Sequence, residues 1–168
     1  MGTLSGLYLH NVDEKGRLAV PSKMRVELGE PFYITCVNNK CLSVYPQQAW
    51  QRFSEKLNQI PQSDASAQRS VRTIFSNAVK CEPDKQGRVL LPQNLRDKVG
   101  IDKEVVTIGV SYRAEIWAKD KWHGYVDEGD KDTDRGIHAS RGEISYQIGW
   151  YYGGTTTNAD DAQHPTDG

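Results

Sequence analysis

Apolar residues in this chain gather in short runs that are bounded by glycine, proline, asparagine or charged residues. The runs are rich in the β-branched and aromatic residues that favour strands. They are LYLHNV (7–12), RLAV (17–20), PFYITCV (31–37), CLSVYP (41–46), RVLL (88–91), EVVTIGV (104–110) and AEIWA (114–118). The short linkers NNK and SYR each separate two neighbouring runs, which predicts two β-hairpins. We expect a mainly β protein with short helices.

Two short helices interrupt the strand pattern. Each is expected to begin after a proline and to end before a glycine, positions that suit a helix start and the residue past a helix end. Apolar residues spaced four apart give each helix one buried face. The residues concerned are Pro21, Met24, Leu28 and Gly29 in the first helix, and Pro92, Leu95, Val99 and Gly100 in the second.

Two longer helical segments lie between the strand runs 41–46 and 88–91. They are QQAWQRFSEKLNQI (47–60) and SDASAQRSVRTIFSNAV (63–79), and Pro61 separates them. Ser63 or Asp64 can cap the second segment, whose apolar residues recur at helical spacing. We therefore expect a helical pair in the middle of the chain.

The chain also repeats itself. DEKGRLAVPSKMRVELG (13–29) aligns without gaps on DKQGRVLLPQNLRDKVG (84–100), at a constant offset of 71 residues. The identities pair Asp13 with Asp84, Gly16 with Gly87, Arg17 with Arg88, Pro21 with Pro92, Arg25 with Arg96 and Gly29 with Gly100. With one inserted residue the likeness extends to LSVYPQQAW and AEIWAKDKW. Each repeat spans roughly 45 to 50 residues, as expected of a small structural repeat.

This organisation predicts four parts of the chain. They are a first repeat at 4–52, a helical connector at 53–77, a second repeat at 78–124 and an acidic tail at 125–168. Within the tail, VDEGDKDTDRG and TTTNADDAQHPTDG have the composition of disordered segments. The apolar run ISYQIGWYYGG between them is either a loosely packed part of the tail or a docking segment for a partner or another subunit.

The repeated turn combines an aspartate, a glycine and an arginine. Aspartate side chains accept hydrogen bonds from their own turn backbone, and glycine permits a positive φ. We therefore interpret Asp13, Gly16, Asp84 and Gly87 as turn-forming residues. Such a turn does not require an arginine, yet Arg17 and Arg88 follow the glycine in both copies. We interpret these two arginines as functional.

The net charge of -1 hides an uneven distribution. Residues 1–122 carry 18 Lys and Arg against 13 Asp and Glu, whereas residues 123–168 carry 3 against 9. A mildly basic body with an acidic tail is compatible with a nucleic-acid partner. The sequence has neither 18 consecutive apolar residues nor a signal-peptide pattern, so we expect a soluble, cytoplasmic protein with no membrane contact.

Reactive chemistry has little support in the sequence. The phosphate-binding patterns GxxxxGK[ST] and GxGxxG and a Ser/His/Asp set are absent, so we expect no enzyme, no cofactor and no small-molecule substrate. Cys36, Cys41 and Cys81 are odd in number and lack a CxxC pair, which favours reduced packing residues over a zinc site. We interpret His10 as an ordinary strand residue rather than a general base.

Together these motifs carry a family resemblance. HNVDEKGRLAVPSKMR, DKQGRVLLPQNLR and EVVTIGVSYRAEIWAKDKW resemble the MraZ family, bacterial proteins with two tandem SpoVT/AbrB-type domains, over residues 4–124. The resemblance implies AbrB-like swapped-hairpin β-barrel halves joined by a helical pair. It also implies a DNA-binding regulator, usually a repressor of its own operon of division and cell-wall genes. Such a regulator assembles into homo-oligomeric rings and recognises short G-rich direct repeats in upstream double-stranded DNA.

The resemblance also assigns roles to residues of the turns. The DNA-contacting arginine of the family falls on Arg17, with Arg88 as its repeat and Lys15 beside it. In the second turn the lysine has moved one place earlier, to Lys85, and Gln86 fills the matching position. Arginine suits a bidentate contact with guanine, and lysine suits phosphate. Such a regulator would be associated with the nucleoid.

Two other functions fit the same sequence. An antitoxin of the AbrB type would use the extra C-terminal segment to cap a toxin. A ring-forming structural protein would not bind DNA, whereas the affinity of a regulator for DNA must fall steeply as the salt concentration rises.

Overall fold

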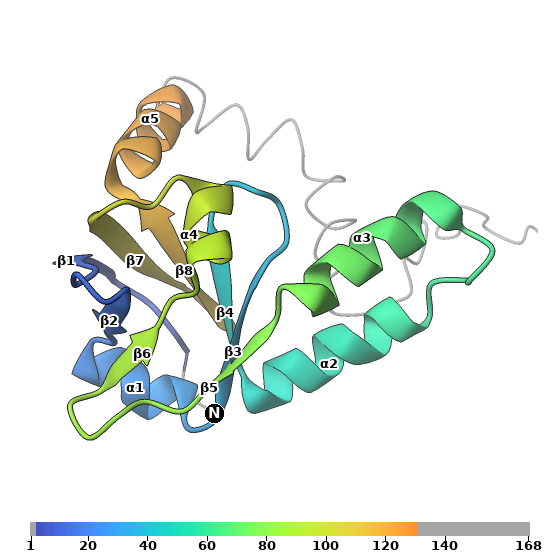
Figure 1. Ribbon diagram of the computed structural model, residues 1–168, viewed down its shortest axis with the longest axis horizontal. Coiled ribbons are helices and arrows are strands. Elements are labelled where there is room, and N and C mark those ends of the chain that lie inside the picture. Colours follow the sequence, from blue (N-terminus) through green and yellow to red (C-terminus); the bar gives the residue numbers. More distant parts are fainter. Residues whose placement is uncertain (1–2, 131–168) are drawn as a thin grey trace, which may run out of the picture.

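The strand and helix runs of the sequence are present in the computed structural model, which describes residues 3–130 (Figure 1). The strands are β1 (Leu7–Asn11), β2 (Arg17–Ala19), β3 (Phe32–Cys36), β4 (Leu42–Pro46), β5 (Val79–Cys81), β6 (Arg88–Leu90), β7 (Glu104–Val110) and β8 (Arg113–Ala118). The helices are α1 (Ser22–Leu28), α2 (Gln47–Asn58), α3 (Ala65–Ser76), α4 (Gln93–Val99) and α5 (Lys119–Asp130). The predicted mainly β fold with short helices is confirmed.

Strands are exchanged between the two repeats. β1 of the first repeat pairs with β7 of the second, and β5 of the second pairs with β3 of the first. β4 pairs with β8, which joins the halves into one antiparallel sheet of order β1-β7-β8-β4-β3-β5. A second, two-stranded sheet again takes one strand from each repeat, β2 and β6. This exchange is the swapped-hairpin arrangement that the resemblance implies.

The glycine turn between β1 and β2 makes only a short local pairing. Between β1 and β2 there is one isolated bridge, from Val12 to Leu18, and the two strands then pair with the other repeat. Pairing across the repeats brings Leu18 and Val89 together under the ribbon, where their exposed fractions are 1% and 5%. Burial of these two side chains favours the pairing of β2 with β6 across the repeats.

The two short helices have the expected bounds and buried faces. α1 follows Pro21 directly, and α4 follows Pro92. The glycines that end them have positive φ angles of 66° and 70°. The buried residues are Met24 and Leu28 in α1, and Leu95 and Val99 in α4. The hairpins β3–β4 and β7–β8 are also confirmed.

The predicted helical pair is formed by α2 and α3, which extend away from the side of the molecule that carries β2 and β6 (Figure 1). Asp64 caps α3 by accepting a hydrogen bond from the backbone N–H of Ala67 at 3.1 Å. The Thr35 hydroxyl donates to the carbonyl of Ile74 at 2.7 Å and so ties α3 to β3. α2 begins inside the first predicted repeat, so the domain limits themselves stay a prediction.

Helix α5 takes the same place after the second repeat that α2 takes after the first. Phe53 of α2 stacks on Tyr45 and is 3% exposed, whereas Tyr125 of α5 lies against Trp117 and is 52% exposed. α5 continues to Asp130, so the first residues of the predicted tail are helical. The remaining tail, including the run ISYQIGWYYGG, lies outside the described residues. No helix within residues 3–130 is long and apolar enough to cross a membrane.

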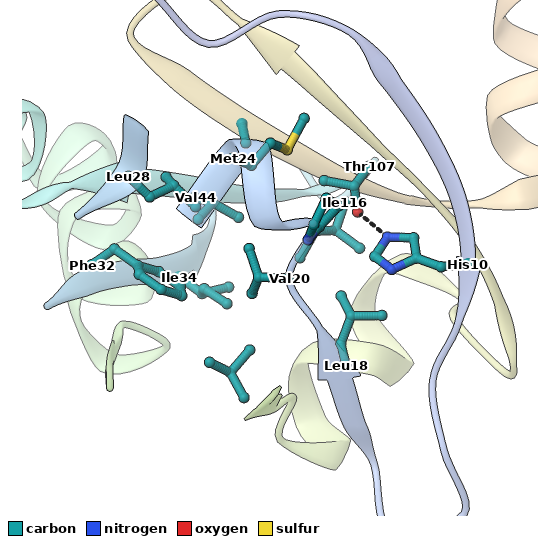
Figure 2. Close-up of a pocket in the computed structure, with 13 residues that line it drawn as sticks. His10, Leu18, Val20, Met24, Leu28, Phe32, Ile34, Val44, Thr107 and Ile116 are labelled. Carbon is teal, nitrogen blue, oxygen red and sulfur yellow. Dashed lines mark hydrogen bonds between the residues drawn. The ribbon is translucent and has the colours of Figure 1, made fainter. Parts of the chain in front are cut away.

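The centre of the barrel is filled by apolar side chains from β2, α1, β3, β4 and β8 (Figure 2). They leave a cavity of about 10 Å³, which is room for one water molecule at most. At its margin His10 Nε2 lies 2.7 Å from Thr107 Oγ1, and His10 Nδ1 lies 3.1 Å from the carbonyl oxygen of Ala19. His10 therefore ties β1 to β2 and β7, which is a structural use of the side chain.

The burial of His10 predicts a pH dependence of stability. Burial lowers the pKa of His10, so the folded protein binds this proton less readily than the unfolded chain does. Stability should be greatest above the ordinary histidine pKa of about 6.5 and should decrease as the pH falls toward the folded-state pKa. We expect the Tm advantage of the natural protein over His10→Gln to shrink between about pH 8 and pH 5. Thermal unfolding of both proteins measures this, and an advantage that grows on acidification would contradict it.

Candidate nucleic-acid interface

The first glycine turn is closed by the carboxylate of Asp13. Its Oδ1 accepts hydrogen bonds from the backbone N–H groups of Lys15 and Arg17, at 2.9 and 2.8 Å. The Asp13 carbonyl accepts a further bond from the N–H of Gly16 at 3.0 Å, and Gly16 has a φ of 82°. The aspartate thus fixes the backbone of the turn, and the glycine allows its left-handed conformation.

The second turn has the same geometry. Asp84 Oδ1 accepts from the backbone N–H groups of Gln86 and Arg88, both at 2.9 Å. The N–H of Gly87 donates to the Asp84 carbonyl at 2.9 Å, and Gly87 has a φ of 77°. Lys85 lies one position before the place that a lysine takes in the first turn. The backbones of the two turns are therefore alike, but their lysines occupy different positions in the turn.

Each aspartate also holds the arginine that follows it. Arg17 Nε donates to Asp13 Oδ2 at 2.8 Å, and Arg88 Nε donates to Asp84 Oδ2 at 2.9 Å. The backbone bonds from the arginines, together with these ion pairs, hold the pKa of both carboxyls below its ordinary value. This pairing was not predicted from the sequence, although the four-residue spacing of Asp and Arg in both repeats is a visible signal for it.

β2 and β6 present both arginines on one face of a two-stranded ribbon. Residues directly opposite each other in an antiparallel pair share a face, and so do residues two apart along a strand. The outward face carries Arg17, Ala19, Arg88 and Leu90, and the inward face carries Leu18 and Val89. The two arginines are diagonal neighbours, a relation that places residues about 7–8 Å apart.

The arginines are strand residues, and the lysines are turn residues. Arg17 begins β2 and Arg88 begins β6, with side chains that are 31% and 30% exposed because each guanidinium rests against its aspartate. Lys15 and Lys85 are exposed on the turns, which lie at opposite ends of the antiparallel ribbon. The structure therefore brings the four predicted DNA-binding residues together on the β2–β6 ribbon and its two turns.

The cysteines give no sign of reactive chemistry. The three cysteines are free and buried. Burial raises the pKa of Cys81 to about 11 and raises that of Cys41 as well, so both thiols are protonated near neutral pH. In the part of the chain that the structure describes, no three His, Cys, Asp or Glu side chains lie close enough together to hold a metal ion.

Two repeats that exchange strands to build one barrel, each with an Asp-x-x-Gly-Arg turn, define a tandem AbrB-like swapped-hairpin protein. Comparison with known families makes the assignment specific. The family model described as "MraZ protein, putative antitoxin-like" matches residues 3–73 and again 74–138. The chain belongs to the MraZ family.

Individual relatives agree with the family match. A protein from Moorella thermoacetica is 49% identical over 123 residues, which cover 73% of this chain and 86% of the relative. One from Desulforamulus reducens is 49% identical over 120 residues, covering 71% and 84%. One from Finegoldia magna is 48% identical over 127 residues, covering 76% and 89%. Each carries the name Transcriptional regulator MraZ.

The ion pair of the first turn can be tested by replacing Asp13 with Asn. Asn keeps the Oδ1 acceptor for the backbone but places an N–H donor opposite Arg17 Nε, so the guanidinium should be released. Arginine Nε–H exchange with water, followed by NMR, should become faster for Arg17 and stay unchanged for Arg88. In the natural protein the bond is present above the lowered pKa of Asp13 and should be lost as the pH falls through it. Unchanged exchange at Arg17 would show that Asp13 does not hold the guanidinium in solution.

Proposed function

We propose that this protein is a DNA-binding transcriptional regulator that reads guanine through Arg17 and Arg88. The observation that carries the proposal is the β2–β6 ribbon, which exposes both arginines on one face while its other face is anchored in the core. The names of the relatives, all transcriptional regulators, support the same class of function.

The shape of the ribbon suits the major groove of B-DNA, which admits a two-stranded β-ribbon. Arginine makes its commonest specific contact there, with O6 and N7 of guanine. Because the Nε of Arg17 is bonded to Asp13 at 2.8 Å, the guanidinium is restrained through Nε, and in this proposal its two Nη nitrogens contact the base edge. A side chain that is already ordered loses less entropy when it binds.

The lysines suit a different part of the DNA. Lys15 and Lys85 are exposed at opposite ends of the ribbon, where a groove-bound ribbon meets the two phosphate backbones. Lysine binds phosphate as a point charge and reads no sequence. In this proposal the arginines supply guanine preference, and the lysines supply affinity that depends on salt.

The finer parts of the proposal concern the target and the assembly. The protein would repress its own operon of division and cell-wall genes from short G-rich direct repeats, as a homo-oligomeric ring in the cytoplasm, associated with the nucleoid. Family membership supports this. So does the small size of the ribbon, since its three-residue strands offer few contacts and strong binding requires several ribbons on one DNA.

A second candidate function is that of an antitoxin, which the antitoxin-like description of the family model favours. It predicts a small toxin gene next to this one and a stable complex between the two products. A ring-forming structural protein is a third possibility, and it predicts no DNA binding that weakens with salt. A gel shift with the DNA upstream of the protein's own gene, at two salt concentrations and with scrambled competitor, separates a regulator from the structural protein. The neighbouring toxin gene and the stable complex distinguish the antitoxin.

Replacing Arg17 tests the proposed base contact. Arg17→Ala should remove roughly 1 to 3 kcal/mol per engaged site and relax the preference for guanine. Arg17→Lys keeps the charge but not the planar fork, so it should also lose the guanine preference while it retains more non-specific affinity. Arg88→Ala should have a milder effect, because Gln86 takes the place of the neighbouring lysine. Competition titrations of specific against scrambled duplex measure these effects.

Lys15→Ala is the matched control for the arginine variants. It should weaken binding to all sequences alike and reduce the dependence of affinity on salt. Thermal unfolding should show each variant to be folded before its DNA binding is compared. If Arg17→Ala is folded and keeps full specificity, the arginine has only an architectural role and the proposal is wrong.

Assembly should control operator affinity. A ring that places several ribbons along direct repeats raises the effective concentration of each further ribbon. Dilution below the assembly concentration should therefore weaken operator binding by more than simple mass action predicts. Light scattering and titration on the same samples test this. A monomer with full-strength operator binding would refute it.

A further inference from the structure

Arg96 of helix α4 contacts the glycine turn of the other repeat. Its Nε donates a hydrogen bond to the carbonyl of Leu91 at 2.9 Å. The N–H of Leu91 in turn donates to the carbonyl of Gly16 at 2.8 Å. One guanidinium nitrogen of Arg96 lies only 2.8 Å from the position that a Cβ on Gly16 would take. The first turn is therefore covered by a side chain of the second repeat.

Arg25 of helix α1 makes the reciprocal contact. The N–H of Val20 donates to the carbonyl of Gly87 at 2.9 Å, as Leu91 does for the first turn. The Nη1 and Cζ atoms of Arg25 lie 2.5 and 2.7 Å from the Cβ position of Gly87. Arg25 Nε is buried without a hydrogen-bond partner among the described residues. The two contacts obey the pseudo-symmetry of the repeats, but only the Arg96 guanidinium is bonded through Nε.

These contacts give a second reason for glycine in each turn. Gly16 and Gly87 are buried, and any side chain at either position would occupy the space that a guanidinium fills. No carboxylate lies within ion-pair distance of Arg25 or Arg96 in residues 3–130, so an ion pair does not explain the two arginines. Both arginines instead lie against the backbone of the glycine turn of the other repeat.

We propose that Arg96 and Arg25 are positioning residues that brace the turns across the repeats. Arg96 would set the turn before Arg17, and Arg25 would set the turn before Arg88. We call each glycine turn, together with the arginine that follows it and the arginine that braces it, a reading unit. Each reading unit then takes its base-reading arginine from one repeat and its bracing arginine from the other. The DNA-reading consequence rests on the proposed function, whereas the brace itself does not.

Amide hydrogen exchange tests the brace without DNA. Arg96→Ala should accelerate exchange at Gly16 and Arg17 about fivefold or more, while Gly87 and Arg88 stay within about twofold, because coupling is confined to groups in contact. Arg25→Ala should show the reverse pattern with a smaller effect, since its Nε makes no bond. Each substitution is thus expected to accelerate amide exchange in the turn of the repeat that does not contain the substituted arginine.

Matched controls remove one positive charge from the same helices without touching a turn. They are Lys98→Ala on α4 and Lys23→Ala on α1, both exposed. Neither control should change exchange at either turn. If Arg96→Ala does not fold, Arg96→Lys keeps the stem and the charge but lacks the planar fork, and the same exchange pattern is expected. Exchange that is unchanged, or that rises equally in both turns, would overturn the proposal.

DNA binding provides the second arm of the test. The probe is a duplex from upstream of the protein's own gene, compared with the same duplex in which the guanines of the repeat are replaced by adenine. Arg96→Ala should lower the preference for the guanine duplex about three- to tenfold and leave the salt dependence unchanged. Equal weakening for both duplexes with a reduced salt dependence would instead make Arg96 a phosphate contact and overturn the positioning role.

The two arms also separate this proposal from the proposed function. If the crossed exchange pattern appears but Arg17→Ala keeps full guanine preference, the brace is present and base reading by Arg17 is wrong. If Arg17→Ala loses the preference but the exchange pattern is absent, base reading stands and the brace is wrong.

Discussion

The exchange of strands between the repeats is the constraint on which the rest of the structure depends. Four strand pairings, β1 with β7, β5 with β3, β4 with β8 and β2 with β6, each join one repeat to the other. Only the hairpins β3–β4 and β7–β8 pair strands of the same repeat. A separate repeat would leave most strand edges unpaired and would expose Leu18 or Val89, so the two repeats form one folding unit.

The exchange also creates the surface that we propose reads DNA. Because β2 and β6 come from different repeats, their pairing brings Arg17 and Arg88 onto one face, although the two residues are far apart in the chain. The two carboxylate oxygens of the aspartate then accept different hydrogen bonds. Oδ1 of Asp13 closes the turn, and Oδ2 holds the arginine. A glutamate has one more rotatable bond, which makes both contacts from the same backbone position harder to maintain.

Much of the fold could be predicted from the sequence, because strand runs, prolines, glycines and the internal repeat are local or periodic signals. The partners of the strands could not be predicted from the pattern alone, since β1 and β2 fit a local hairpin as well as an exchanged one. The bracing of Gly16 by Arg96 was visible only as an identity between repeats, because the contact joins distant residues. α5 was not predicted, because its sequence is acidic and contains two glycines, which are poor helix formers.

The two reading units are alike in backbone and unlike in side chains, and this difference bears on the kind of DNA site that suits them. Lys15 occupies the position that Gln86 takes in the second turn, and the brace of the first turn is hydrogen-bonded while that of the second is not. A two-fold symmetric pair of units suits a palindrome. Two unequal reading units make the ribbon asymmetric along the groove. An asymmetric ribbon suits short DNA sequences that are repeated in the same orientation. The departures from symmetry within one chain thus favour direct repeats over palindromes as the target of the proposed regulator.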